Sequence, residues 1–183
     1  MIRDFSPIIK RLLFFFSASF IVSVCKNECI LSPLPEEYVW IARISSLTST
    51  VVGNSASVML LFIILYATWY LSVLIRCHIN LDSFIESANN FIGVFIIGEA
   101  VKFSLIWIFL REEVLSFDYD SSDIMSQLTS TYYFKISNYT SIAIAVVSTI
   151  VFGYSVFDDK SNPKFASLIT LVLAFLLFLN ILL

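Results

Sequence analysis

The stretch ANNFIGVFIIGEAVKFSLIWIFL, residues 88–110, is long and apolar enough to cross a membrane, yet it contains a glutamate and a lysine three positions apart. A membrane-spanning helix needs about 20 mostly apolar residues to cross about 30 Å of hydrocarbon. Lipid cannot pair exposed backbone polar groups, and this run lacks the two-residue alternation of a barrel strand. We therefore predict a transmembrane helix here, with Glu99 and Lys102 inside it.

The rest of the chain repeats this pattern. Apolar residues make up 58% of the 183 residues, charged residues make up only 14%, and the mean hydropathy is +0.89. A soluble domain of this size does not need so much apolar surface. Four further runs are long and apolar enough to span: residues 8–25, 51–75, 137–157 and 165–183. We expect an all-α, polytopic integral membrane protein with five spans, which form a single transmembrane domain over residues 1–183.

Basic residues predict the orientation of the chain. The first span has the basic start of a signal peptide, but residues 25–29 lack the small residues of a cleavage site, so we expect the span to be retained. With the amino terminus inside, the inner side receives six basic residues and the outer side four: Arg3, Lys10, Arg11, Arg76, Lys160 and Lys164 against Lys26, Arg43, Arg111 and Lys135. The positive-inside rule therefore predicts the amino terminus inside and the carboxyl terminus outside.

Two predicted outer segments are more than connectors. Residues 35–48 begin with a proline and two glutamates, which suits the first turn of a helix, and Tyr38 and Trp40 are typical anchors at a membrane surface. We expect an interfacial helix there. Residues 111–136 are acidic, and we predict a solvated loop with a short surface helix from Ile124 onward. The acidic residues lack the glycine and the distal glutamate of a calcium loop.

Glu99 and Lys102 are the strongest candidates for a functional site. Glu99 lies near the middle of its span, about 15 Å from either surface. The two side chains share a helix face and can pair, and charges at this depth usually face protein or a water-filled cavity. The pair should mark the buried face of the span, where Gly98 allows a neighbouring backbone to come close. At the inner end, we expect Asn89 and Asn90 to make hydrogen bonds between helices.

Two roles stay open for this charged pair. It could be a coupling or substrate site, or a contact to a polar group on another subunit. Alternatively, it could be a neutralised ion pair that locks the packing of the helices.

A repeat of small residues predicts a helix-packing face in the fourth span. Ser141, Ala145, Thr149 and Gly153 recur at every fourth position. In lipid, small residues on one face let two helix backbones approach closely. The face could pack within the chain or against a partner.

Other residues give little support to catalytic or metal chemistry. The single histidine, His78, excludes paired-histidine haem ligation within one chain, and Cys25 and Cys29 are poorly spaced for a disulfide within a helix. The predicted inner loops are too short for a soluble catalytic or nucleotide-binding domain. We expect no enzyme activity, no metal site, no cofactor and no nucleic-acid partner.

Two segments carry a resemblance to a known family. NLDSFIESANNFIGVFIIG runs from a short loop into the third span, and FKISNYTSIAIAVVSTIVFGYSVFDDKSNPKFASLITLVLAF forms a helix pair joined by a tight polar turn. Together with the five predicted spans, they resemble the Yip family of small membrane proteins over about residues 50–183. The resemblance implies a non-enzymatic adaptor, since eukaryotic members act in vesicle traffic and bacterial members are often associated with export machinery.

Three functional hypotheses follow from the sequence. The first is a non-enzymatic accessory or scaffolding subunit of a larger assembly in the plasma (inner) membrane, in contact with other integral subunits such as those of an ABC-type exporter. The second is a small transporter or channel that self-associates and uses Glu99 and Lys102. The third is an immunity or sensor protein that uses its outer segments.

Overall fold

The computed structural model describes residues 5–34, 36–74, 80–117, 124–158, 167 and 170–174. Nearly all of these residues are helical. In chain order the elements are α1 (Ser6–Leu31), α2 (Glu36–Leu74), α3 (Leu81–Leu105), the π-helix η2 (Ile106–Leu110), α4 (Arg111–Val114), α5 (Ile124–Ser130) and α6 (Tyr132–Asp158).

Four helices in the described part of the chain are long and apolar enough to cross a membrane: Ser6–Leu31, Val39–Leu74, Leu81–Val114 and Tyr132–Val156. The third combines α3, η2 and α4 into one continuous helix of 34 residues. The chain is thus a helical, multi-pass membrane protein. The fifth predicted span, residues 165–183, lies mostly outside the described residues, although residue 167 and residues 170–174 are helical.

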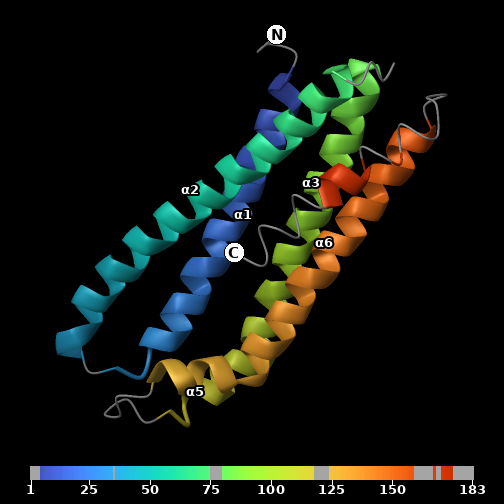
Figure 1. Cartoon of the computed structure of the whole chain (residues 1–183). Helices are drawn as coiled ribbons and strands as arrows, with labels where there is room; N and C mark the ends of the chain where they lie inside the picture. Colours follow the sequence, from blue (N-terminus) through green and yellow to red (C-terminus); the bar gives the residue numbers. More distant parts are fainter. Residues whose placement is uncertain are drawn as a thin grey trace.

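The four long helices follow one another as neighbours (Figure 1). α2 packs against α1, α1 packs against α3, and α3 packs against α6. α2 and α6 therefore form the two outer edges of the row, and α5 lies at one end of the bundle. We call this end the α5 end and the other the opposite end. The α2 and α6 edges flank the side of α1 and α3 that faces the viewer in Figure 1.

The segment over residues 35–48, where the sequence predicts an interfacial helix, is helical from Glu36 and is not a separate element, because α2 runs without a break from Glu36 to Leu74. No proline interrupts this segment, and hydroxyl groups along it donate to backbone carbonyls of the same helix, as Thr48 does to Ile44 at 2.9 Å. A continuous helix cannot lie flat on the membrane and then cross it. The Trp40 side chain is exposed near the α5 end of α2; the Tyr38 side chain lies outside what the structure describes.

The predicted loop over residues 111–136 is also shorter than expected. The long third helix continues to Val114, and the helical residues resume with α5 at Ile124, where the sequence predicts a surface helix. Glu113 explains how the loop closes: its two carboxylate oxygens accept the backbone N–H groups of Tyr132 and Tyr133 at 2.9 and 3.2 Å. A carboxylate stabilises a helix N-terminus by pairing free amides and by its charge. Glu113 thus fixes α6 to the end of α4.

α3 and α6 make a close contact at Gly98. A Cβ atom at this position would clash with the side chain of Ile144 in α6. On the α6 side, the buried residues recur in adjacent pairs at helical spacing: Ile144, Ala145, Ser148, Thr149, Phe152 and Gly153. The predicted small-residue face is therefore a packing face within the chain. Ser141 is partly buried, and Gly153 makes close contact with Thr170.

Two apolar clusters form the core, one toward each end of the bundle. The larger cluster lies toward the opposite end and includes Phe84, Phe91 and Phe152, with Leu173 from the last described segment. The smaller cluster lies toward the α5 end and includes Val22, Ile106, Leu110, Val114 and Tyr133. Along α3, Glu99 and Lys102 fall between the residues of the two clusters.

The contact at Gly98 predicts a specific cost for a larger side chain. We expect Gly98→Leu to destabilise the protein by about 1–3 kcal/mol, because it overpacks the contact between α3 and Ile144. Gly93→Leu is the matched control, since an added Cβ at Gly93 has nothing within 4 Å. Thermal unfolding of both variants in detergent would measure the difference, and equal effects would contradict the close contact.

Candidate functional site

Glu99 and Lys102 form an ion pair in the middle of the third long helix. The Lys102 ammonium nitrogen lies 3.0 Å from the Glu99 carboxylate oxygen Oε1, as the three-residue spacing predicts. The side chains are 23% and 9% exposed, respectively. Glu99 lies about 27 Å from the start of α3 and about 22 Å from the end of α4, at 1.5 Å per residue. The pair therefore lies at bilayer depth if this helix crosses the membrane.

Lys26 of α1 belongs to the same group of charges. It interacts electrostatically with both Lys102 and Glu99. Its position follows from the buried face of α1: Ile8, Phe15 and Val22 are seven residues apart and buried, and Lys26 is four residues beyond Val22. Positions four apart on a helix share a face. Lys26 thus points from α1 toward the interior of the bundle, where α3 presents Glu99 and Lys102. We call these three residues the charged cluster.

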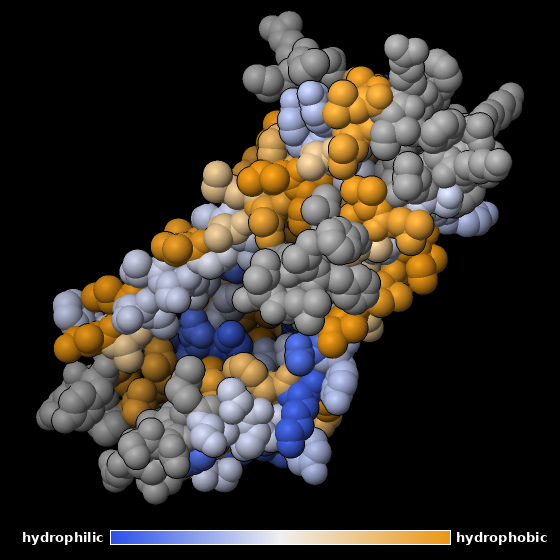
Figure 2. Space-filling view, in the orientation of Figure 1, coloured by the Kyte–Doolittle hydropathy of each residue, from blue (hydrophilic) through white to orange (hydrophobic). Residues whose placement is uncertain are grey.

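A hollow opens on this side of the bundle. Figure 2 shows hydrophilic side chains in a depression between the α2 and α6 edges, in the half nearer α5. The charged cluster lies on the interior faces of α1 and α3, the two helices between these edges. Charged residues in membrane helices are usually found against such a cavity, where water or a polar partner can reach them.

A ladder of polar contacts joins α1 to α2 beside the hollow. The Ser19 hydroxyl donates to the Asn54 side-chain oxygen at 3.2 Å, and the Asn27 amide donates to the Thr50 hydroxyl at 2.9 Å. Hydrogen bonds between membrane helices each contribute about 0.6 kcal/mol on average. These contacts hold α2 against α1 and help to keep it apart from α6.

The ladder ends in a bidentate ion pair near the α5 end. The Arg43 guanidinium donates to both Glu28 carboxylate oxygens at 2.7 Å. Both side chains are more than 40% exposed, at 48% for Arg43 and 43% for Glu28. The Glu28 carboxylate is therefore paired with Arg43 of α2 and does not neutralise the charged cluster.

The long helix contains a π-helical turn, Ile106–Leu110, just after the cluster. A π-turn contains an extra residue and occurs frequently at functional sites. Ile106, Leu110 and Val114 are four residues apart, share one helix face and are all buried. The same turn presents Trp107 and Arg111 toward α1, with the guanidinium carbon 5.7 Å from the centre of the indole ring.

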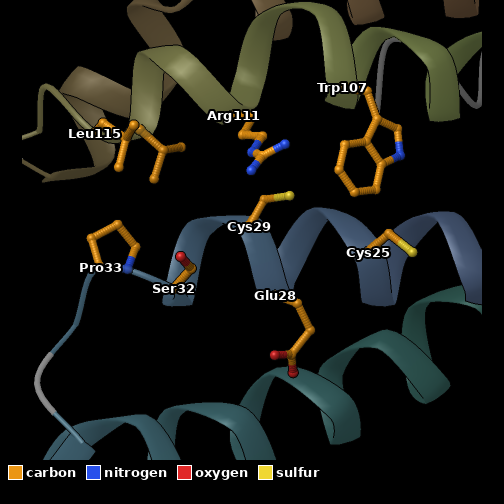
Figure 3. Close-up of a pocket in the computed structure, with 9 residues that line it drawn as sticks. Cys25, Glu28, Cys29, Ser32, Pro33, Trp107, Arg111 and Leu115 are labelled. Atoms are coloured by element: carbon orange, nitrogen blue, oxygen red, sulfur yellow. The ribbon is translucent and has the colours of Figure 1, made fainter.

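Trp107 and Arg111 line a pocket of about 430 Å³ with residues of α1 and its C-terminal turn. Figure 3 shows Arg111 above Cys29 and Trp107 above Cys25, with the Cys29 thiol on the side of α1 that faces Arg111. Glu28 points the other way, toward α2. Both cysteines are free thiols. Two thiols and one guanidinium do not make a metal site, and the described residues contain no group of three His, Cys, Asp or Glu side chains that could hold one.

The two asparagines lie at the opposite end of α3, far along the helix from the charged cluster. The Asn90 side-chain amide donates to the Ser155 hydroxyl of α6 at 3.3 Å, which is the hydrogen bond between helices that its position predicts. In the described structure the side-chain oxygen of Asn89 is buried without a partner. The structure thus does not bring Asn89 and Asn90 together with Glu99 and Lys102.

Lys26 is not predicted as a member of the site from the sequence. The first predicted span ends at Cys25, which places Lys26 among the outer-loop charges. The signal that could have found it is the buried face marked by Ile8, Phe15 and Val22, because Lys26 lies four residues beyond Val22 and so shares that face. No sequence pattern predicts the ion pair between Glu28 and Arg43, because the two residues meet only when α1 and α2 pack together.

Chemically, this arrangement can hold charge. Two ammonium groups and one carboxylate on the interior faces of two helices form a polar contact that can lock helices, bind an anionic group or line a path. In comparisons with known proteins, no protein-family model, no curated protein and no solved structure matches the chain. The resemblance to the Yip family therefore stays a prediction.

The ion pair predicts a non-additive response to neutral substitutions. We expect Glu99→Gln alone to lower the free energy of unfolding in detergent by about 2 kcal/mol or more, because it leaves Lys26 and Lys102 without their counter-charge. The double variant Glu99→Gln/Lys102→Met should lose less than half as much, since it removes the pair together. A double variant at least as unstable as the single variant would contradict this interaction.

Proposed function

We propose that this chain is a non-enzymatic accessory or scaffolding subunit of a larger membrane assembly, such as an export or transport complex. The observation that carries this proposal is the hydrophilic hollow between α2 and α6, with the charged cluster on the helices that form its floor. Charge at bilayer depth costs several kcal/mol unless protein or water covers it. A hollow of this kind is a surface for another membrane protein.

The division of the described residues between long helices and short turns supports the same function. Nearly all described residues belong to the four long helices and the short turns between them. The surfaces that this part of the chain offers to a partner are therefore helix faces at membrane depth. Partners would be other integral membrane subunits, and an ABC-type exporter is one assembly of this kind. The family resemblance, which implies an adaptor, agrees with this function.

The same proposal includes the finer topology. We propose five spans with the amino terminus inside and the carboxyl terminus outside, in the plasma (inner) membrane. The distribution of basic residues supports this orientation. This orientation places α5, and the end of the bundle nearer the charged cluster, on the outer side of the membrane.

A second candidate is a small oligomeric transporter or channel. The charged cluster favours it, because three ionisable groups at membrane depth could line a polar path for ions or a small substrate. Four or five helices are few for a carrier that acts alone, so this candidate requires self-association. It predicts that the protein is recovered as a homo-oligomer.

Isolation from the native membrane separates these two functions. The protein would be tagged at its natural expression level, extracted in mild detergent, and the stoichiometric partners identified by mass spectrometry. The accessory function predicts recovery with other integral membrane subunits. Recovery of the chain alone as a homo-oligomer would contradict it and favour the transporter.

A further inference from the structure

A polar pocket lies between the first turns of α1 and α3, far along both helices from the charged cluster. Both helices begin at the opposite end of the bundle (Figure 1). The pocket has a volume of about 620 Å³, and the residues that line it belong to the described ranges 6–11 of α1 and 82–90 of α3. The walls of the pocket are therefore side chains that the structure shows.

The pocket lies at the depth of the lipid headgroups. The long helix from Leu81 to Val114 has 34 residues, so it is about 51 Å long at 1.5 Å per residue. The hydrocarbon of a bilayer is about 30 Å thick, and the headgroups add roughly 5–8 Å on each side. A helix centred in this bilayer extends about 10 Å beyond the hydrocarbon at each end. Asp82 and Glu86 lie in this extra length, at the level of the headgroups.

The pocket contains charged groups of both signs. Asp82 and Glu86 are four residues apart, so their carboxylates share a face of α3 and repel each other. Arg11 lines the same pocket from α1. The ion pairs between described residues lie in the charged cluster and at Glu28, and none of them joins Arg11 to either carboxylate. Because all three side chains are exposed, a ligand at the membrane surface can reach both the guanidinium and the carboxylates.

Asn89 adds an acceptor to the same wall. It lies three residues beyond Glu86, which places it on the same face of α3, and it also lines the pocket. Its side-chain oxygen is buried without a partner in the described structure. A buried acceptor is unfavourable unless a donor pairs with it. The α3 wall of the pocket thus offers two carboxylates and one amide to a donor group, and the α1 wall offers one guanidinium to an acceptor group.

From this arrangement we propose that the pocket binds the headgroup of a phospholipid with a primary amine, such as phosphatidylethanolamine. Its phosphate lies at Arg11, because a guanidinium donates two parallel hydrogen bonds to a phosphate. Its ammonium group lies at Asp82 and Glu86, because an ammonium group has three donors for acceptors of this kind. The site goes beyond the proposed accessory function and does not depend on it.

The two charges of the pocket predict which lipid it selects. A choline headgroup has the same phosphate and positive charge but no N–H donor, so it cannot donate to the carboxylates. A glycerol headgroup has no positive charge, so its lipid is a net anion that the carboxylates of Asp82 and Glu86 repel. The amine lipid is the one of the three that satisfies both walls of the pocket.

Native mass spectrometry of the whole chain tests this selection. The protein in detergent would be titrated with phosphatidylethanolamine, phosphatidylcholine and phosphatidylglycerol that carry identical acyl chains, and the bound lipids would be counted. We expect one phosphatidylethanolamine to bind about tenfold more tightly than either other lipid, since it alone makes charge-assisted hydrogen bonds to both walls.

Three variants identify the groups that select the lipid. Glu86→Gln should remove the preference for phosphatidylethanolamine over phosphatidylcholine and leave phosphatidylcholine binding unchanged. Arg11→Met should weaken both of these lipids by a similar factor, because both carry the phosphate. Lys10→Met is the matched control, since Lys10 is an exposed basic residue of the same turn of α1 that does not line the pocket; it should keep the preference.

Several results would overturn the proposal. Equal binding of the three lipids would do so, as would a preference for phosphatidylethanolamine that survives both Arg11→Met and Glu86→Gln. Displacement of the bound lipid by an equal concentration of phosphoethanolamine would show that the occupant is a soluble zwitterion. Binding of calcium that Glu86→Gln removes, together with lipid binding that Glu86→Gln does not change, would show that the carboxylates hold a metal ion instead.

Discussion

Charge inside an apolar helix is the constraint on which the rest of this structure depends. Glu99 and Lys102 lie near the middle of a 34-residue helix that is apolar enough to span a membrane. Neither side chain can be left in hydrocarbon without a large cost. The chain meets this cost in two ways, by pairing the two groups on one helix face and by turning that face toward α1 and the hollow.

The packing on either side of the cluster holds this arrangement in place. Gly98 lets α6 approach α3 directly beside Glu99, with Ile144 against the missing Cβ. The two apolar clusters lie above and below the charges along α3 and fix the helices at both ends. Glu113 joins α6 to the end of the long helix, and the polar ladder joins α2 to α1. With α2 and α6 held to separate helices, the space between them can stay open.

Much of this fold follows from local properties of the sequence. Hydropathy and length predict the four long helices, and the three-residue spacing predicts the contact between Glu99 and Lys102. The parts that could not be predicted depend on contacts between distant segments. Residues 43–57 are rich in serine and threonine, so their hydropathy falls although α2 continues through them. Glu113 looks like a loop residue until α6 is placed beside it, and Lys26 becomes part of the site only because α1 packs against α3.

Access of water to the charged cluster tests the account most directly. In a variant whose native cysteines are replaced by serine, Lys26→Cys and Lys102→Cys would be treated in vesicles with a membrane-impermeant, negatively charged thiol reagent. Ile97→Cys is the control, because Ile97 is exposed on the outer surface of α3, where lipid would cover it. We predict that positions 26 and 102 react while position 97 is protected. Protection of positions 26 and 102 to the same degree as position 97 would contradict a polar hollow at the centre of this protein.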